Sequence, residues 1–269
     1  PEERWHIWTI DMRNGRAKQL TDGDVYDEQE PRWTPDGKSI VFMSNRSDDP
    51  DFNPDSVDLF VIPAAGGDLR KIETVVGNKS MPSVSPDGQW VAAGTQTGEI
   101  HLYNRTTGNE SWAYTSAPRV YDLEFAREAP LLAVASGSDS SGRLYLFSNA
   151  SNNPLVDYPI SKAFTSVAVH RNGSWLAGGA DDGKVYLVSA QTGLEAWSYS
   201  LGNSVDDIAA NGVGTHLLAG GGNKQLALLA VADGVPLWIA TVEDPITCVA
   251  ASWRGEYPVP YTPLTLPTT

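Results

Sequence analysis

The chain has 269 residues, of which 41% are apolar, nine are tryptophan and one is cysteine, and its formal net charge is −14. This length and apolar content suit one large domain or two ordinary ones with a buried core, and they exclude a disordered chain. One cysteine excludes a disulfide framework, an iron–sulfur ferredoxin and a cysteine-rich zinc module. The acidic balance argues against nucleic acid as the main partner, and no apolar stretch reaches the roughly 18 residues of a membrane span.

Short runs rich in β-branched and aromatic residues recur along the chain, and Gly, Pro, Asn or Asp separates them. Such runs predict strands, whereas no segment of ten or more residues has a helical period. One run recurs at residues 5–11, 58–64, 99–105, 143–149, 184–190 and 225–231. A turn followed by an apolar run recurs at residues 35–42, 86–94, 128–136, 171–179 and 211–221.

The spacing of the turns indicates a repeated unit. Matching turn positions lie 41 or 44 residues apart from Gly88 to Gly255, and 51 residues apart from Gly37 to Gly88. Four-stranded units of this length, repeated around a ring, are typical of a β-propeller. The chain opens on the last two strands of a unit (5–21) and closes on the first strand of another (246–252), with five complete units between them. We therefore predict an all-β, six-bladed β-propeller in which the N-terminal strands and the C-terminal strand share one blade and close the ring.

Residues 1–252 are predicted to form this single domain, and residues 253–269 form a Pro/Thr-rich tail. Prolines at positions 258, 260, 263 and 267 cannot donate to a sheet ladder. The tail is therefore an edge strand at best, and otherwise an extended linker. Because residue 1 is proline and no signal peptide is visible, we interpret the chain as processed or cut from a longer one.

The repeats resemble those of two known families. LTDGDVYDEQEPRWTPDGKSIVFMSNRSDD and DLFVIPAAGGDLRKI, within residues 5–94, resemble TolB-like repeats (WD40-like PD repeats), which also build the propeller of prolyl-oligopeptidase-type serine peptidases. Residues 95–252 resemble PQQ-like and WD40-like repeats, through NRTTGNESW (104–112), SAQTGLEAW (189–197) and ADGVPLW (232–238). The resemblance implies partner binding in an envelope compartment for the first family, and a catalytic hydrolase domain beside the propeller for the peptidases.

The departures from these families favour a chain that is not an enzyme. Neither Gly-His nor Trp-Asp recurs, and one cysteine cannot form the vicinal pair of many PQQ dehydrogenases. We expect Trp112, Trp197 and Trp238 to pack between blades rather than to hold a cofactor. No G-x-S-x-G, H-E-x-x-H, P-loop or G-x-G-x-x-G motif occurs. His170 is expected to be a solvated turn residue, and Cys248 an inert core residue of a buried strand.

An acidic insertion provides the strongest local candidate for a cofactor, a calcium ion. Its oxygen-bearing residues Asp49, Asp51, Asn53 and Asp55 alternate and Asp58 follows, at the spacing that a Ca²⁺ loop uses. The loop departs from that motif, because Pro54 replaces the expected Gly and Phe60 the expected Glu. The alternative is a solvated acidic loop without metal.

The net charge is concentrated in one set of loops. In a propeller, the loops that enter each blade and those that join its second and third strands share one face. The 77 residues of these predicted loops hold 18 of the 33 acidic residues and 5 of the 19 basic ones. We predict an acidic face that binds a protein partner or cationic ligand, with representative residues Asp24, Asp27, Glu28, Asp122, Asp206, Asp207, Glu243 and Asp244. The alternative is that this charge serves only solubility.

Six N-x-S/T sequons predict a glycosylated chain that is extracellular, on the cell surface or periplasmic; they lie at Asn45, Asn78, Asn104, Asn109, Asn149 and Asn172. Asparagine-rich turns are the alternative explanation. Two functional hypotheses follow. The first is a non-enzymatic propeller scaffold that binds through its acidic face, and the second is the gating propeller of a prolyl-oligopeptidase-type peptidase whose hydrolase domain is absent from this chain.

Overall fold

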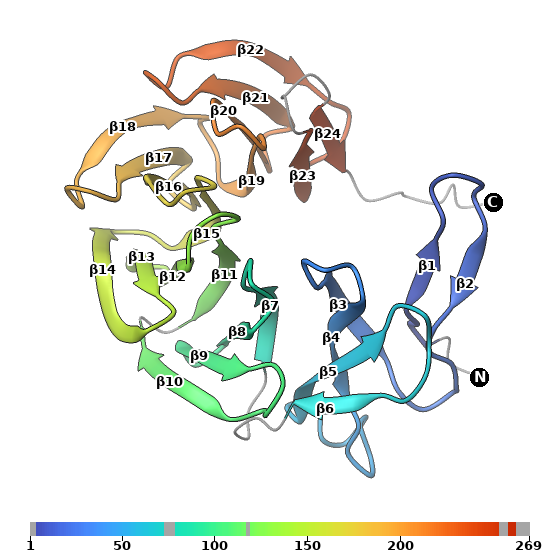
Figure 1. Ribbon diagram of the computed structural model, residues 1–269. Coiled ribbons are helices and arrows are strands. Elements are labelled where there is room, and N and C mark those ends of the chain that lie inside the picture. The colour runs from blue at the N-terminus through green and yellow to red at the C-terminus, as the bar shows by residue number, and fades with distance from the viewer. Residues whose placement is uncertain (1–3, 73–78, 117–118, 253–257, 262–269) are drawn as a thin grey trace. The chain divides into compact units, whose positions relative to one another are not determined.

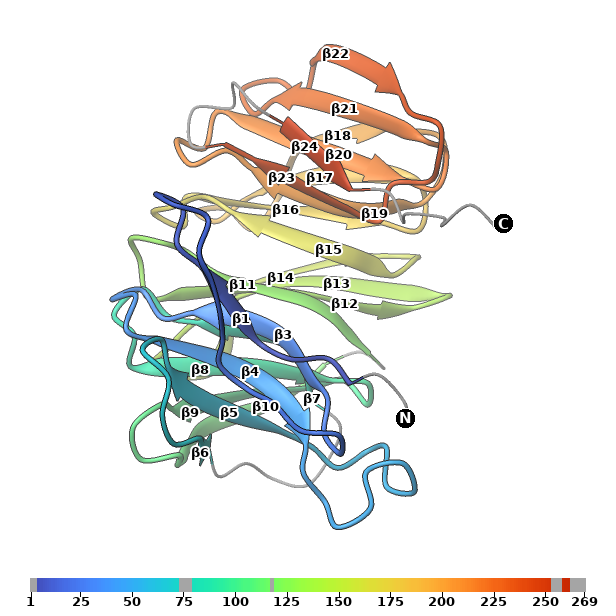
Figure 2. The ribbon, with the colours of Figure 1, turned by 90° about the vertical axis from the view of Figure 1, so that its right-hand side faces the viewer.

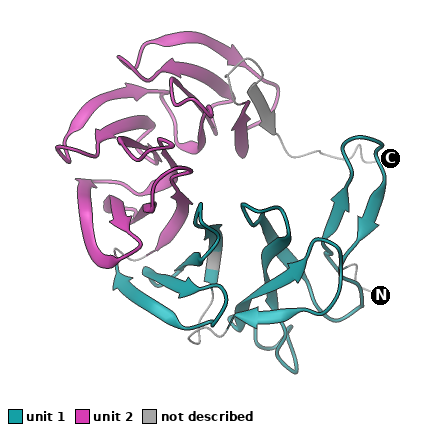
Figure 3. Ribbon diagram, viewed as in Figure 1, with its two compact units in different colours: residues 1–115 teal, residues 116–269 magenta. Residues whose placement is uncertain are grey.

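The computed structural model describes residues 4–72, 79–116, 119–252 and 258–261, and all the regular elements within these ranges are β-strands (Figure 1). The chain divides into two compact units, unit 1 (Pro1–Thr115) and unit 2 (Ser116–Thr269) (Figure 3). None of the described residues forms a helix long and apolar enough to cross a bilayer.

Unit 1 contains a strand pair and two four-stranded antiparallel sheets. The pair is β1 (Trp8–Ile10) and β2 (Ala17–Gln19). The first sheet contains β3 (Glu28–Trp33), β4 (Ser39–Asn45), β5 (Val57–Pro63) and β6 (Arg70–Ile72). The second contains β7 (Lys79–Val84), β8 (Trp90–Thr95), β9 (Glu99–Asn104) and β10 (Glu110–Thr115).

Unit 2 contains three four-stranded antiparallel sheets and a second pair. The first sheet contains β11 (Val120–Phe125), β12 (Leu131–Ser138), β13 (Ser141–Ser148) and β14 (Ser151–Ile160). The second contains β15 (Phe164–Val169), β16 (Trp175–Ala180), β17 (Lys184–Ser189) and β18 (Glu195–Ser200). The third contains β19 (Val205–Ala210), β20 (His216–Gly221), β21 (Gln225–Ala230) and β22 (Pro236–Thr241). The pair is β23 (Cys248–Ala251) and β24 (Pro258–Tyr261).

The middle strands β4 and β16 are apolar on both faces, because each face packs in a different hydrophobic cluster. In β4, Ile40 and Phe42 pack with Ile7 in one cluster, whereas Val41 and Met43 belong to another. Figure 2 shows the sheets of unit 2 one after another, and their first strands β11, β15, β19 and β23 lie next to each other in that order. Burial on both sides is why these strands are runs of Val, Leu, Ala and Gly rather than alternating sequences.

The all-β, six-bladed propeller architecture predicted from the repeats is confirmed. Each predicted four-strand unit is one antiparallel sheet in sequence order, and a separate strand pair lies near each terminus. The joining of these pairs into one closed blade stays a prediction, as does the single domain, because the pairs belong to different units. In the tail, residues 258–261 form an edge strand on β23, with Val249 opposite Pro260.

Candidate acidic binding site

The first strand of each complete sheet contains a bulge, and in β3, β11, β15 and β19 a polar residue at the bulge contacts the next blade. In unit 2, the register shifts at Asp122, Ser166 and Asp207, which occupy equivalent positions in β11, β15 and β19. Asp122 Oδ2 accepts a hydrogen bond from Val167 N at 2.9 Å, and Asp207 Oδ2 accepts one from Val249 N at 2.7 Å. A bulge frees backbone N–H groups from the ladder, so these side chains fasten one blade to the next.

Ser166 lies between the two aspartates and links them. Its Oγ is 2.8 Å from Asp207 Oδ1 and 3.2 Å from Asp122 Oδ2, and it accepts a hydrogen bond from Ile208 N. A serine hydroxyl has a single proton to donate. Donation to both carboxylates at once is therefore impossible, and the second contact is a hydrogen bond only when that carboxyl carries a proton.

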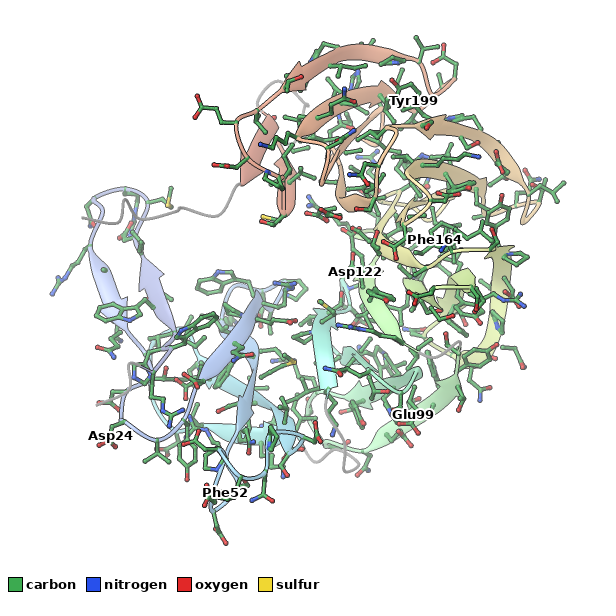
Figure 4. The ribbon with its side chains drawn as sticks, turned by 180° about the vertical axis from the view of Figure 1, so that it is seen from behind. Asp24, Phe52, Glu99, Asp122, Phe164 and Tyr199 are labelled. Atoms are coloured by element: carbon green, nitrogen blue, oxygen red, sulfur yellow. The ribbon has the colours of Figure 1, made fainter. Side chains whose placement is uncertain are left out.

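Burial raises the pKa values of this row of carboxyl groups. Burial raises the pKa of Asp122 to about 6, and the charge of Asp207 acts in the same direction. Burial, with the negative charge of Asp122, raises the pKa of Glu124 to about 7, and Glu124 Oε2 accepts a hydrogen bond from Val169 N at 3.2 Å. Asp122, which Figure 4 labels at the inner edge of the unit, Glu124 and Asp207 each accept a hydrogen bond from a backbone amide of the next blade.

Four acidic residues of unit 2 lie at one strand end, whereas the exposed residues Glu128 and Asp233 lie at the opposite end. Asp139 follows β12, Asp181 and Asp182 follow β16, and Asp206 opens β19, so three successive blades contribute. Partial burial raises the pKa of Asp181, and the negative charges of Asp206, Asp139 and Asp182 raise it further, whereas Lys162 lowers it. These four aspartates, here called the acidic cluster, are close enough to repel each other.

Glu243 and Asp244 lie in the loop before β23, at the same strand end as the acidic cluster. Glu243 is exposed, and Lys224 Nζ donates to its backbone oxygen at 2.7 Å. At the opposite strand end of unit 2, Glu128 forms an ion pair with Arg171 at 3.4 Å. The two ends of the unit thus differ in how their acidic residues are compensated.

In unit 1, the predicted ligand residues Asp27 and Glu28 are paired with cations. Glu28 is 3% exposed, and its carboxylate contacts Arg46 Nη2 at 2.5 Å, His6 Nδ1 at 2.9 Å and Thr21 Oγ1 at 2.7 Å. The prediction that Glu28 lies on an exposed face is wrong. β3 begins inside the protein, and the Glu28 carboxylate accepts hydrogen bonds from buried and half-buried polar groups. Asp24 is exposed (Figure 4).

The predicted calcium residues are not brought together around one point. Asp51 contacts Arg4 at 3.1 Å, and Asp58 contacts Lys71 at 2.7 Å. Asp49 Oδ1 accepts a hydrogen bond from Phe52 N, and its backbone oxygen accepts one from the Asn53 amide. Among the residues that the structure describes, Asp55 included, no group of three or more His, Cys, Asp and Glu side chains could hold a metal ion. The loop geometry gives the calcium prediction no support.

The remaining predicted positions are structural or lie on loops. Trp197 Nε1 donates to Val231 O of the next blade at 2.8 Å, and Trp112 is 9% exposed, as expected for packing residues. Cys248 is exposed, so its predicted burial is wrong: the inner strand β23 turns it away from the packed face. His170 is half-buried beside Trp175 rather than solvated.

Among the sequons, the side chains of Asn109 and Asn172 are exposed, and those of Asn45, Asn104 and Asn149 are half-buried. The Asn45 amide donates to Asn53 O at 2.6 Å. Asn78 lies outside the described residues.

Sequence reasoning missed Ser166 and Glu124. The signal that reveals Ser166 is the repeat itself, because Asp122, Ser166 and Asp207 are spaced by 44 and 41 residues, as the turns are. A polar residue that returns at one register position of a buried strand needs a partner.

Comparison with known proteins supports the fold. The family model "WD domain, G-beta repeat" matches residues 158–189. A chain of a solved structure, "Crystal Structure of Mitotic Checkpoint Complex", is 14% identical with a TM-score of 0.76, and the match covers 95% of this chain and 78% of that one. These matches show that the chain has a β-propeller fold with a WD-type repeat in one segment.

One curated relative carries a peptidase name. The chain is 30% identical over 123 residues to "Uncharacterized peptidase YuxL" of Bacillus subtilis (strain 168). The match covers 46% of this chain and 18% of that protein, so the chain spans less than a fifth of its relative.

Proposed function

We propose that this chain is a non-enzymatic propeller scaffold, exported or on the cell surface, which binds a cationic segment of a protein partner through acidic loops. The WD40-type fold supports the scaffold role. The excess of sequons supports the exported location, since Asn109 and Asn172 are exposed. The acidic loops identify the chemistry of the partner.

One observation carries the proposal: the acidic cluster gathers Asp139, Asp181, Asp182 and Asp206 from three successive blades of unit 2. Like charges held near each other cost free energy: burial raises the pKa of Asp181, and the charges of Asp206, Asp139 and Asp182 raise it further. A lysine or arginine side chain placed among them removes this repulsion. The cluster is therefore matched to a positively charged peptide.

Binding of this kind depends on salt. Each exposed ion pair contributes roughly 0 to 1 kcal/mol, so several must act together. At an ionic strength of about 0.15 M the Debye length is roughly 8 Å, so charges beyond the contact are screened. Association with a basic peptide should therefore be fastest and tightest at low salt.

The test is a calorimetric titration of the whole chain with an octalysine peptide at low salt. The double variant Asp181→Asn/Asp206→Asn should weaken binding about ten-fold, because it removes two of the repelling charges that a cation would compensate. The matched control is Glu128→Gln/Asp233→Asn, which removes the same charge at the opposite strand end and should leave the affinity within about two-fold.

Equal weakening by both double variants would show that only net charge matters, and would overturn the assignment of the site to the acidic cluster. No binding by the unsubstituted chain at low salt would overturn the proposal altogether. Unchanged melting temperatures in both variants ensure that the comparison concerns binding.

A second function, the gating propeller of a prolyl-oligopeptidase-type peptidase, is favoured by the peptidase name of the curated relative. In that case a hydrolase sequence with a G-x-S-x-G elbow adjoins this chain in its gene. Sequencing the gene beyond residue 269 distinguishes the two functions. Peptidase activity that appears only when such a domain is joined to this chain would favour the second.

A further inference from the structure

Unit 1 contains a cavity of about 290 Å³ between the beginning of β3, the end of β4 and the acidic insertion that follows β4. Its polar lining includes Asp27 and Gln29 near the start of β3, Ser44 at the end of β4 and Asp51 from the insertion. The cavity combines negative charge with several polar groups. Chain segments far apart in sequence build it.

Arg4 of the chain itself fills the charged part of this cavity. Its Nη1 lies 3.3 Å from Asp27 Oδ2, its Nη2 lies 3.1 Å from Asp51 Oδ2, and its Nε donates to Asp24 O at 3.4 Å. The Arg4 side chain is 14% exposed. Three acceptors from two loops therefore surround one guanidinium group, which is the planar fork that arginine presents.

The backbone beside Arg4 is held independently of its side chain. Trp5 N donates to Asp27 Oδ1 at 2.8 Å, and Glu28 N donates to Trp5 O at 2.9 Å. Arg4 also precedes β1 and belongs to no strand. Its side chain can therefore leave the cavity while the chain on its C-terminal side stays in place.

A second group in the cavity wall has no partner. Ser44 is 2% exposed, and its Oγ is buried without a hydrogen bond among the described residues. An unsatisfied buried hydroxyl costs about 1 to 3 kcal/mol. Arg4 does not satisfy this group, so the resident side chain leaves part of the cavity unused.

We propose that this cavity is a recognition site for an arginine side chain of a protein partner, and that Arg4 occupies the site in its absence. The proposal rests on the proposed binding of a cationic partner and identifies the residue that unit 1 recognises. The incoming guanidinium takes the places of the Arg4 guanidinium on Asp24 O, Asp27 and Asp51, and the adjoining peptide groups extend toward Ser44.

The site should prefer arginine to lysine. A guanidinium reaches the two carboxylates and the Asp24 carbonyl with separate N–H groups held in one plane. A lysine ammonium is a point donor and cannot span the same acceptors. This selectivity separates the cavity from the acidic cluster of unit 2, where charge alone decides.

Removal of the resident side chain provides the test. A tethered group competes at an effective concentration in the millimolar range, so Arg4→Ala should bind acetyl-Gly-Arg-Gly-amide about ten-fold more tightly than the unsubstituted chain does. The corresponding lysine peptide should gain less than about two-fold. Adding Asp51→Asn to Arg4→Ala should abolish the gain, because the carboxylate that receives Nη2 is lost.

Arg4→Lys is the second variant, to be used if Arg4→Ala fails to fold. It retains the positive charge but not the fork, and it should also bind the arginine peptide more tightly. An unchanged affinity in the folded variants, or an equal gain for the lysine peptide, would overturn the site.

The acidic-cluster variant Asp181→Asn/Asp206→Asn, combined with Arg4→Ala, separates this proposal from the previous one. The gain for the arginine tripeptide should persist there even though octalysine binding falls. Loss of that gain in the combined variant would show that the tripeptide binds at the acidic cluster and not in the cavity.

Discussion

The two units carry acidic residues at the same strand end but treat them differently. In unit 1, Arg4 neutralises Asp27 and Asp51, and Arg46 with His6 surrounds Glu28. In unit 2, burial and the other residues of the acidic cluster raise the pKa of Asp181, and Lys162 opposes this effect. Charge density read from loops therefore overstates the available negative charge, because availability depends on which cations the fold brings to each loop.

The bulges of the first strands also differ between the two units, in their backbone conformation. In unit 1 they contain Glu30 and Met81 with φ of 50° and 54°, each followed by a proline. Glu30 Oε2 accepts a hydrogen bond from Met81 N at 2.8 Å. In unit 2 the bulges use Asp122, Ser166 and Asp207, all outside the left-handed region. Left-handed backbone costs about 1 to 2 kcal/mol in a non-glycine residue, so unit 1 maintains its blade contacts at a conformational cost that unit 2 avoids.

Removing a hydrogen bond between blades of unit 2 should have the largest effect on stability. Asp207→Ala leaves Val249 N without its acceptor, and we expect the free energy of unfolding to fall by about 3 kcal/mol. Asp207→Asn retains an acceptor and should lose less than about 1 kcal/mol. Urea titration measures both changes, and Asp139→Ala, an exposed control, should change stability by less than about 0.5 kcal/mol. Equal losses for Asp207→Ala and the control would contradict a stabilising role for the hydrogen bond between Asp207 and Val249.

The stability of unit 2 should depend on pH through its buried carboxyl groups. Burial raises the pKa of Asp122 to about 6 and that of Glu124 to about 7, above their ordinary values, so between pH 4 and 7 the folded state binds more protons than the unfolded state. These groups therefore contribute most below about pH 4, and their contribution is lost as pH rises to about 7, by roughly 3 kcal/mol for each group.

Hydrogen exchange of the Val167 and Val169 amides measures this loss, because Asp122 and Glu124 accept from them. Glu124→Gln should flatten the profile between about pH 5 and 7, whereas Glu128→Gln should not. A profile unaltered by Glu124→Gln would contradict the raised pKa of that group.

The turn glycines provide the smallest and most direct contrast. Gly37 in unit 1 and Gly214 in unit 2 both have positive φ, 65° and 74°. A Cβ at Gly37 meets nothing within 4 Å, whereas one at Gly214 would overlap the His170 ring of the preceding blade. Gly214→Ala should therefore lower the free energy of unfolding by about 1 kcal/mol more than Gly37→Ala does, as thermal or urea unfolding would measure. Equal losses would mean that only φ matters and that the turns of unit 2 are no more tightly packed.

The propeller fold was predictable because it depends on local signals that repeat. Turn residues of Pro-Asp-Gly type and runs of Val, Leu and Ala define strand after strand, and their period defines the blade. The candidate site was predictable only in part. Asp206 lies where the loop count placed it, but Glu28 and Cys248 do not, because the burial of a residue at a strand end depends on which neighbour covers it.

By itself, therefore, the sequence determined the strands, their four-strand units and the blade number. These features follow from residue type and spacing over short distances. Only the tertiary structure decided which charges are compensated, since Arg4 meets Asp51 across 47 positions of the chain. It also decided that Asp122 and Asp207 fasten blades, because the amide of the next blade comes within reach only when the sheets pack.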